Sequence, residues 1–205
     1  MIFERKTGWS ILGVAVLLGG LISCSPIYVM KVHYQMPSME KGPEGKKVFL
    51  VFKDERPDRT ILTSNAENSV GTLADDFSFS WGYTEKPGVK MGIYGLDEMF
   101  KAAFRKRLNN LGVDVVKSKE DSPVELVIAL KTFRVDLVGS SWKVTLDYDA
   151  RLIKGGQVLA KQFVQGQGKR FKWVGRGELD KAVSEIFSDS VNRLNLERLY
   201  QLANI

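Results

Sequence analysis

The strongest structural signal in this 205-residue chain lies in residues 142–157, which read WKVTLDYDARLIKGGQ. Apolar side chains occupy every second position from Trp142 to Leu152, which is typical of a strand with one buried face. The Gly-Gly pair at 155–156 then supplies the two central residues of a tight turn. Residues 158–171 return as the partner strand. The sequence therefore predicts an antiparallel hairpin at the centre of the fold.

Further strand signals precede this hairpin. Residues 47–53 are apolar except for their terminal lysines, which is typical of a strand buried on both faces. Residues 113–116 predict a short strand. Within residues 124–137 the alternation changes phase after Leu130, which indicates a β-bulge or a sharp bend in the sheet. Together with the hairpin, these segments predict one mainly antiparallel sheet.

Two amphipathic helices are expected beside this sheet. Residues 96–111 place apolar side chains at three- and four-residue spacing, and a second such stripe begins at about Glu178. Leu196, Leu199, Tyr200 and Leu202 can extend that second helix. The predicted fold is α+β and two-layered, with two helices packed on one sheet face, in the order strand, helix, strand, meander, helix. Residues 47–205 are expected to form this single domain.

The N-terminal residues resemble an export signal. Two cations, Arg5 and Lys6, precede an apolar run at 9–22 that is too short and too glycine-rich for a spanning helix. The run ends in Leu21-Ile22-Ser23-Cys24, which resembles the lipobox of bacterial lipoproteins. We expect a cleaved signal peptide at 1–23 and a lipidated tether at 24–46, in which residues 27–30 and Val32 can add a short strand. The alternative is an uncleaved membrane anchor in which Cys24 is an ordinary apolar residue.

The lipobox resemblance implies that Cys24, the one cysteine of the chain, carries an S-diacylglyceryl group and an N-acyl chain such as palmitate. No other cofactor is expected. Two or three acyl chains hold a protein durably on a membrane, so a membrane is the first expected partner. The next residue is Ser25, not the aspartate that retains enterobacterial lipoproteins in the inner membrane. The resemblance thus implies the outer membrane, facing the periplasm, with the inner membrane as the alternative.

Candidate catalytic and metal-binding residues are few. His33 is the sole histidine, and the sequence names no positioned partner for it. One histidine and one cysteine are too few for a His/Cys metal site. Asp147 and Asp149 share a strand face, either as a carboxylate pair or with cross-strand partners such as Lys161. We therefore expect a protein that is not an enzyme and binds no metal.

Two charged stretches have alternative explanations. Residues 54–59, DERPDR, follow a buried strand, where loops often carry function, but their alternating charges also describe a self-paired turn. Residues 166–169, GQGK, lack a phosphate-loop pattern and indicate a bulge or a flexible edge. Trp173 stands among Lys169, Arg170, Lys172 and Arg176. In an exported protein such a cluster would meet lipid headgroups or glycans, so no nucleic acid partner is expected.

Two functions remain open from the sequence. The first is a non-enzymatic envelope module that binds an envelope protein or associates with itself through a contact patch at Phe77, Phe79, Trp81 and Tyr83. These aromatics belong either to a strand with one aromatic face or to an exposed loop. The alternative function is a lipid- or glycan-binding carrier, an auxiliary component of an envelope transport system. Its pocket would be lined by Trp142, Tyr148, Phe163 and Trp173.

The order of these segments resembles the YajG-like family of bacterial lipoproteins. The residues that carry the resemblance are Val48–Val51, the DERPD stretch at 54–58, Phe104–Gly112, Val124–Leu130 and the last helix. The resemblance implies an α+β domain on the periplasmic side of a membrane. It implies no catalytic residues.

Overall fold

The predicted hairpin supplies two of the three long strands of the larger of two sheets. The computed structural model describes residues 27–38, 42–83, 88–172 and 176–205. Strands β7 (Ser141–Lys154) and β8 (Gln157–Phe171) pair antiparallel along their length. Gly155 and Gly156 have φ angles of 57° and 80°, and such a pair of positive φ angles matches the twist of the two strands. The hairpin prediction is confirmed.

Three further strands complete the larger sheet, whose order is β5-β2-β6-β7-β8. Strand β6 (Val124–Val138) pairs antiparallel with β7, and a register shift between Leu130 and Thr132 confirms the predicted bulge. Strand β2 (Lys47–Asp54) runs parallel to β6, and β5 (Asp114–Val116) runs parallel to β2. The sheet is therefore mixed, and its two antiparallel pairings are the longer ones.

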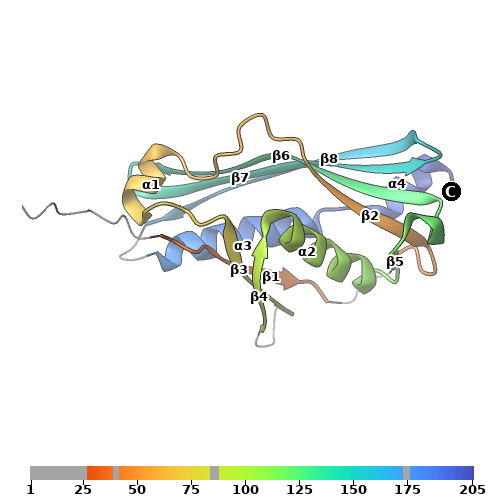
Figure 1. Cartoon of the computed structure of the whole chain (residues 1–205), viewed down its shortest axis with the longest axis horizontal. Helices are drawn as coiled ribbons and strands as arrows, with labels where there is room; N and C mark the ends of the chain where they lie inside the picture. Colours follow the sequence, from red (N-terminus) through yellow and green to blue (C-terminus); the bar gives the residue numbers. More distant parts are fainter. Residues whose placement is uncertain (1–26, 39–41, 84–87, 173–175) are drawn as a thin grey trace, which may run out of the picture.

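Among the residues that the structure describes, the second layer covers one face of the larger sheet and leaves the other face open (Figure 1). Strand β2 accordingly buries Val48 and Leu50 on its inner face, whereas Phe49 and Val51 on the outer face stay partly exposed. The expectation that β2 is buried on both faces is wrong. On the open face, the side chains of Phe49 and Val51 lie between the neighbouring strands β5 and β6.

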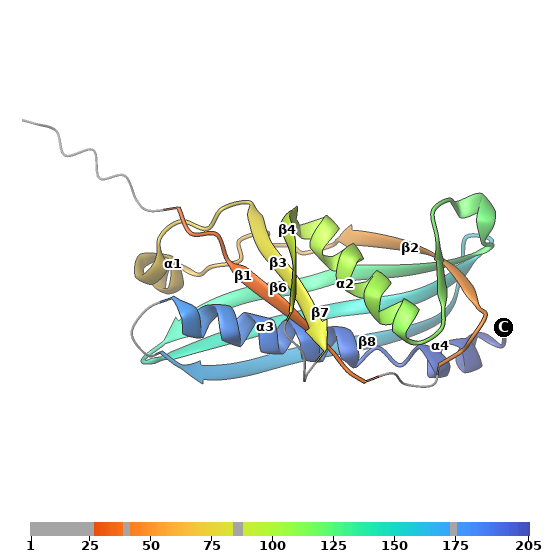
Figure 2. The same ribbon diagram turned by 90° about the horizontal axis from the view of Figure 1, so that it is seen from below.

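The second layer contains a small sheet as well as helices, as Figures 1 and 2 show. Its strands are β1 (Lys31–Met36), β3 (Asp76–Tyr83) and β4 (Val89–Gly95), in the order β1-β3-β4. Strand β1 is parallel to β3, and β4 is antiparallel to β3. The α+β class is thus confirmed, but the expected single sheet is replaced by two mixed sheets.

Four α-helices accompany the strands among the described residues. They are α1 (Ser64–Val70), α2 (Leu96–Asn110), α3 (Gly177–Asn192) and α4 (Leu196–Ala203), and Lys119–Asp121 forms the short 3₁₀ helix η1. The two predicted long helices, α2 and α3, both lie on the inner face of the larger sheet (Figure 2). In the described part of the chain, each helix is too short or too polar to cross a membrane.

Part of the segment expected as a tether is folded. Tyr28 forms a parallel bridge with Leu73, and β1 begins three residues later. Met30, Val32, Tyr34 and Met36 are buried in the core. The fold therefore starts near Tyr28 and not at residue 47. The expected signal peptide at 1–23 and Cys24 lie outside the described residues.

The core between the two layers is strongly aromatic. The ring of Phe100 on α2 lies 5.1 Å from that of Phe187 on α3 and 5.0 Å from that of Phe52 on β2. Phe133 on β6 contacts Phe100 edge-on. Such pairs add roughly 0.5–1.5 kcal/mol each beyond the area that they bury. They join both helices to the larger sheet.

Candidate functional site

The structure divides the predicted contact patch of four aromatics. Phe77 and Phe79 are buried, with their rings 6.3 Å from Phe133 and Phe187 respectively. These two side chains belong to the core, so their assignment to an exposed contact surface is wrong. Side chains alternate along β3, and the face that carries Phe77 and Phe79 points towards the larger sheet.

The other two predicted residues lie near the end of β3. The ring of Trp81 lies 5.9 Å from that of Tyr83, and the Nζ atom of Lys106 sits 4.1 Å from the Trp81 ring centroid. Trp81 is therefore partly covered by α2 through a cation–π contact. Tyr83 is 38% exposed and remains at the surface.

Exposed apolar side chains continue from Tyr83 onto β4. Val89, Met91 and Ile93 are all exposed, and β4 is an edge strand of the small sheet. A register shift between Phe79 and Ser80 places a bulge in the β3–β4 pairing, at the level of Met91. We call Tyr83, Val89, Met91 and Ile93 the hairpin surface. Sequence reasoning missed the β4 residues although Val89, Met91 and Ile93 occupy alternate positions, because the glycines at 88, 92 and 95 disfavour a strand.

The charged loop after β2 contains an ion pair between two of its own residues. Asp54 and Arg56 form a two-point ion pair, with Nε–Oδ1 and Nη2–Oδ2 distances of 2.9 Å. The Arg56 guanidinium thereby lowers the pKa of Asp54, against the effect of burial. Pairing within the turn therefore accounts for Asp54 and Arg56, whereas Glu55 and Asp58 of the same loop pair with side chains of the larger sheet.

Glu55 of the same loop reaches across the outer face of the larger sheet. Arg151 on β7 donates to it at 3.0 Å, and Lys131, the bulge residue of β6, at 2.6 Å. These two hydrogen bonds lower the pKa of Glu55 to about 2. Arg151 also contacts Asp149 at 2.9 Å, and Lys161 on β8 lies 3.1 Å from Asp149. The predicted Asp149–Lys161 pairing is present, although Asp149 is buried and not exposed.

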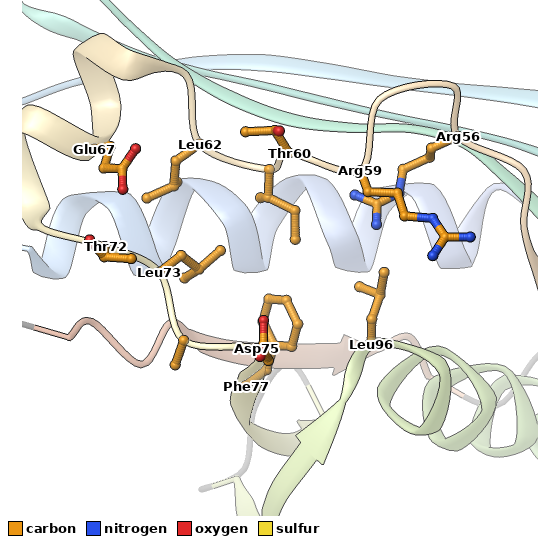
Figure 3. Close-up of a pocket in the computed structure, with 12 residues that line it drawn as sticks. Arg56, Arg59, Thr60, Leu62, Glu67, Thr72, Leu73, Asp75, Phe77 and Leu96 are labelled. Carbon is orange, nitrogen blue, oxygen red and sulfur yellow. The ribbon is translucent and has the colours of Figure 1, made fainter.

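A cavity of about 350 Å³ opens behind this loop, between it, α1, β3 and the start of α2 (Figure 3). Its apolar lining includes Ile61, Leu62, Leu73, Phe77 and Leu96. Arg56 and Arg59 approach it from the loop, and Figure 3 shows Leu96 on the opposite side. The buried Arg56 side chain leaves its Nη1 atom without a hydrogen-bond partner. We call this space the loop cavity.

Glu67 and Asp75 also line the loop cavity, so its polar groups carry both signs of charge. An unpaired buried N–H costs free energy, and a bound acceptor would remove that cost. The arrangement can hold a small molecule with an acceptor group at the Arg56 end and an apolar body. Sequence reasoning missed it because its residues come from four separate segments.

The residues expected to line a carrier pocket do not share one. Trp142 and Tyr148 are fully buried in the core, where the Tyr148 hydroxyl donates to the carbonyl of Ser190 at 2.8 Å. Phe163 lies on β8 at the opposite, open face and is exposed. Trp173 lies outside the described residues. The predicted lining is therefore wrong for Trp142, Tyr148 and Phe163.

A row of polar side chains on helix α3 forms hydrogen bonds with the backbone groups along the free edge of β1. The backbone N–H groups of alternate β1 residues donate to this row at 2.8–2.9 Å. The pairs are Lys31 to Asp180, His33 to Ser184, and Gln35 to Ser188. Asn192 Nδ2 donates to the Gln35 carbonyl at 2.9 Å. The sequence contains a pattern that indicates this polar row, since Asp180, Ser184, Ser188 and Asn192 recur at four-residue intervals.

His33 belongs to this edge and not to a tether. Its Nδ1 atom lies 2.9 Å from Ser80 Oγ, and burial lowers the pKa of the imidazole. Within the ranges that the structure describes, no group of three or more His, Cys, Asp or Glu side chains is placed to hold a metal ion.

Comparisons with known proteins find similarity in structure but not in sequence. No family model and no curated protein matches the chain. The fold is similar to that of protein XCC0632 from Xanthomonas campestris, of the DUF330 family. The TM-score is 0.55 and the identity 16%, over 85% of this chain and 95% of the other. This similarity shows the fold alone.

Weaker structural similarities include lipoprotein GNA1162 from Neisseria meningitidis, with a TM-score of 0.30 and 12% identity over 72% of this chain and 99% of the other. The PelC dodecamer from Paraburkholderia phytofirmans gives a TM-score of 0.34 and 13% identity over 75% and 96% of the two chains. At these TM-scores neither similarity bears on the function of this chain. Membership of the YajG-like family remains a prediction.

Proposed function

We propose that this chain is a lipid-anchored, non-enzymatic protein of the bacterial envelope that faces the periplasm and binds another envelope protein. The observation that carries the proposal is Leu21-Ile22-Ser23-Cys24, which stands directly before the folded domain. Ser25 after the cysteine favours the outer membrane, and acyl chains on Cys24 are the one cofactor proposed. Self-association is the second form that such binding can take.

The hairpin surface is the proposed contact. Exposed apolar side chains on a soluble domain mark interaction sites, and Tyr83, Val89, Met91 and Ile93 are exposed around the edge of the β3–β4 hairpin, with Ile93 on the opposite face from Val89. An unpaired edge strand adds backbone donors and acceptors that another protein can use. This surface replaces the predicted patch, of which Tyr83 remains partly exposed.

Site-specific crosslinking in living cells tests this contact. A photoreactive amino acid replaces Ile93, which is 59% exposed, and in a matched strain it replaces Val158, which is 55% exposed and lies beside the β7–β8 turn. We expect a discrete crosslinked protein from position 93 and none of that mass from position 158. The same products from both positions, or none from position 93, would contradict the proposal.

One observation favours a carrier as the second candidate function. The loop cavity has apolar walls and an unpaired buried guanidinium N–H, and its volume of about 350 Å³ falls at the lower end of the range for small-molecule pockets. A ligand with an acceptor group and an apolar part, such as a lipid or a glycan derivative, fits that chemistry.

Native mass spectrometry of the unacylated domain tests the carrier function. We expect a co-purifying small molecule that is lost in Arg56→Met and kept in Arg134→Met, which removes an exposed arginine paired with Asp58 on the open face. Ligand-free wild-type protein from its own host would argue against a carrier.

A further inference from the structure

The fold begins almost at the proposed lipid anchor. Tyr28 is held in place from several directions, since its N–H donates to the carbonyl of Thr72 at 2.8 Å and its hydroxyl donates to Asp180. The Arg176 guanidinium lies 5.3 Å from its ring centroid. Tyr28 is buried, whereas Ile27 before it is 71% exposed.

The length of chain between Cys24 and Tyr28 limits how far the domain can stand from the bilayer. Four extended residues span at most about 14 Å between their Cα atoms. Part of that length crosses the headgroup region, which is about 5–7 Å thick on each side of the hydrocarbon core. The first folded residues are therefore held within about one Debye length, roughly 10 Å, of the headgroups.

Several segments meet at the end of the molecule where the chain leaves the fold. Figures 1 and 2 both show α1, the β6–β7 turn, the last residues of β8 and the start of α3 at that end. Lys172 links them, since its Nζ donates to Ser69 of α1 and its N–H to the Ser140 carbonyl in the turn. We call this region the anchor end.

Exposed apolar side chains stand at the anchor end. Val138 and Phe171 are each 52% exposed, and both flank Ser141 in one row across β6, β7 and β8. Ile27 adds a third such side chain at the point where the chain enters the fold. The other end of the sheet lies about 40 Å away along β7, at strand geometry of 3.3 Å per residue.

The charges at the anchor end favour an anionic surface. Lys169 and Arg176 are exposed there, and Lys172 stands beside them. Of the acidic groups close by, Glu178 is ion-paired with Arg170 and Lys181, and Asp180 accepts hydrogen bonds from the Tyr28 hydroxyl and the Lys31 N–H, whereas Glu67 on α1 is exposed. Asp136 in β6 accepts from Thr63.

We propose that the anchor end docks on the surface of the membrane that holds Cys24, with Ile27, Val138 and Phe171 at the headgroups and Lys172 and Arg176 facing anionic lipids. This inference rests on the proposed lipidation of Cys24. It gives the domain a fixed orientation, with the β7–β8 turn and α4 farthest from the bilayer (Figure 1). A short tether and a lipid-binding end act together, because the anchor keeps the docking surface at high local concentration.

Spin labels on the acylated full-length mature protein test this orientation. Lipidation consumes Cys24, so Val138→Cys, Phe171→Cys and Val158→Cys each provide the sole free thiol. Val138 and Val158 are a matched pair, 52% and 55% exposed beside the two opposite turns of the same sheet. The protein is reconstituted in vesicles of phosphatidylethanolamine and phosphatidylglycerol, and collisions with oxygen and with a water-soluble nickel chelate are measured.

We expect labels at 138 and 171 to gain oxygen collisions and lose nickel collisions several-fold relative to the label at 158. Arg176→Gln should reduce that difference. Equal nickel access at all three positions in vesicle-bound protein would overturn the docking while leaving the lipid anchor intact. Loss of both collision types at 138 would mean contact with protein and would also overturn it. Protein without acyl chains on Cys24 would contradict the proposed function itself, and this inference with it.

Discussion

Gly166 of β8 lies where α3 crosses closest to the larger sheet. A Cβ atom at Gly166 would stand 2.0 Å from the Oγ of Ser190 and 3.0 Å from the carbonyl oxygen of Leu146. At Gly168 the nearest atom is the Cδ1 of Ile186, at 2.4 Å. The two glycines therefore let the helix pack on the strand. The sequence-based interpretation of a bulge or flexible edge is wrong here, because the helix that requires the glycines lies twenty residues further along the chain.

Gly166→Ala should destabilise the protein. Its methyl group meets backbone and a buried serine, and overpacking of this kind costs about 1–3 kcal/mol. Gly177→Ala is the control, because no atom lies within 4 Å of a Cβ atom at that position and alanine favours the helix. Urea unfolding measures both. Equal midpoints for Gly166→Ala and Gly177→Ala would show that α3 does not press on β8.

Glu55 should contribute to stability in a pH-dependent way. Hydrogen bonds from Arg151 and Lys131 lower its pKa from 4.5 to about 2 in the folded state. A lowered folded-state pKa gives stability that is present above pH 4.5 and is lost as the pH falls towards 2. The contribution is of the order of 1 kcal/mol, because solvent at a partly exposed side chain screens the ion pairs.

Glu55→Gln should therefore flatten the loss of stability between pH 4.5 and 2 relative to wild type. The control is Glu120→Gln, which changes an exposed glutamate on η1, the short helix that follows β5 in the chain. Thermal unfolding midpoints across this pH range provide the measurement. An acid profile that Glu55→Gln leaves unchanged would rule out the role assigned to the Glu55 ion pairs.

At the scale of elements, the contact between β1 and α3 joins the small sheet to the helix within the second layer. Four residues of α-helix rise about 6 Å, and two residues of strand about 6.7 Å, so polar residues at every fourth helix position can meet alternate strand residues. Asp180, Ser184, Ser188 and Asn192 make this match with β1. The edge strand is thereby closed to other chains, and β4 is left as the accessible edge of the small sheet.

Ser188→Ala should cost about 1 kcal/mol of stability, because it removes the acceptor of the Gln35 N–H. Asp189→Ala, one residue on, removes an exposed ion pair with Arg193 and should change stability by less than about 0.5 kcal/mol. Chemical denaturation of both variants checks the difference. If the two variants are equally stable, the β1–α3 contact does not contribute as described.

Elements with a local signal could be predicted from the sequence, whereas the pairing of strands that are distant in the chain could not. The β7–β8 hairpin, the β6 bulge and α2 each follow from spacing within one segment. Parallel pairing of β2 with β6 joins residues about seventy positions apart, and no local pattern encodes it. The alternation of Met30, Val32, Tyr34 and Met36 was present, but the surrounding glycines and prolines favoured a tether.

The candidate sites show the same limit. Phe77 and Phe79 alternate as a strand face should, yet only the second layer decides that this face points inward. The loop cavity depends on Arg56, α1, β3 and α2 coming together, which is a property of the tertiary fold. The Cys24 prediction, in contrast, rests on four adjacent residues and needs no tertiary contact.

For the whole molecule, the early start of the fold is the main correction. With β1 inside the domain, the linker to Cys24 shrinks from the expected 24–46 segment to a few residues. On the proposed lipidation of Cys24, the domain would be held at the membrane surface and would not range through the periplasm. Both the hairpin surface and the anchor end gain their proposed roles from that placement.

Acylation of Cys24 is the claim on which this account rests. Metabolic labelling with palmitate, followed by mass spectrometry of the mature N-terminus, tests it directly in wild type and in Cys24→Ala. We predict a labelled wild-type protein that begins at an acylated Cys24 and sediments with membranes, and an unlabelled, uncleaved Cys24→Ala variant. A wild-type protein that keeps residues 1–23 and takes up no palmitate, or a Cys24→Ala variant that is still labelled, would contradict the account.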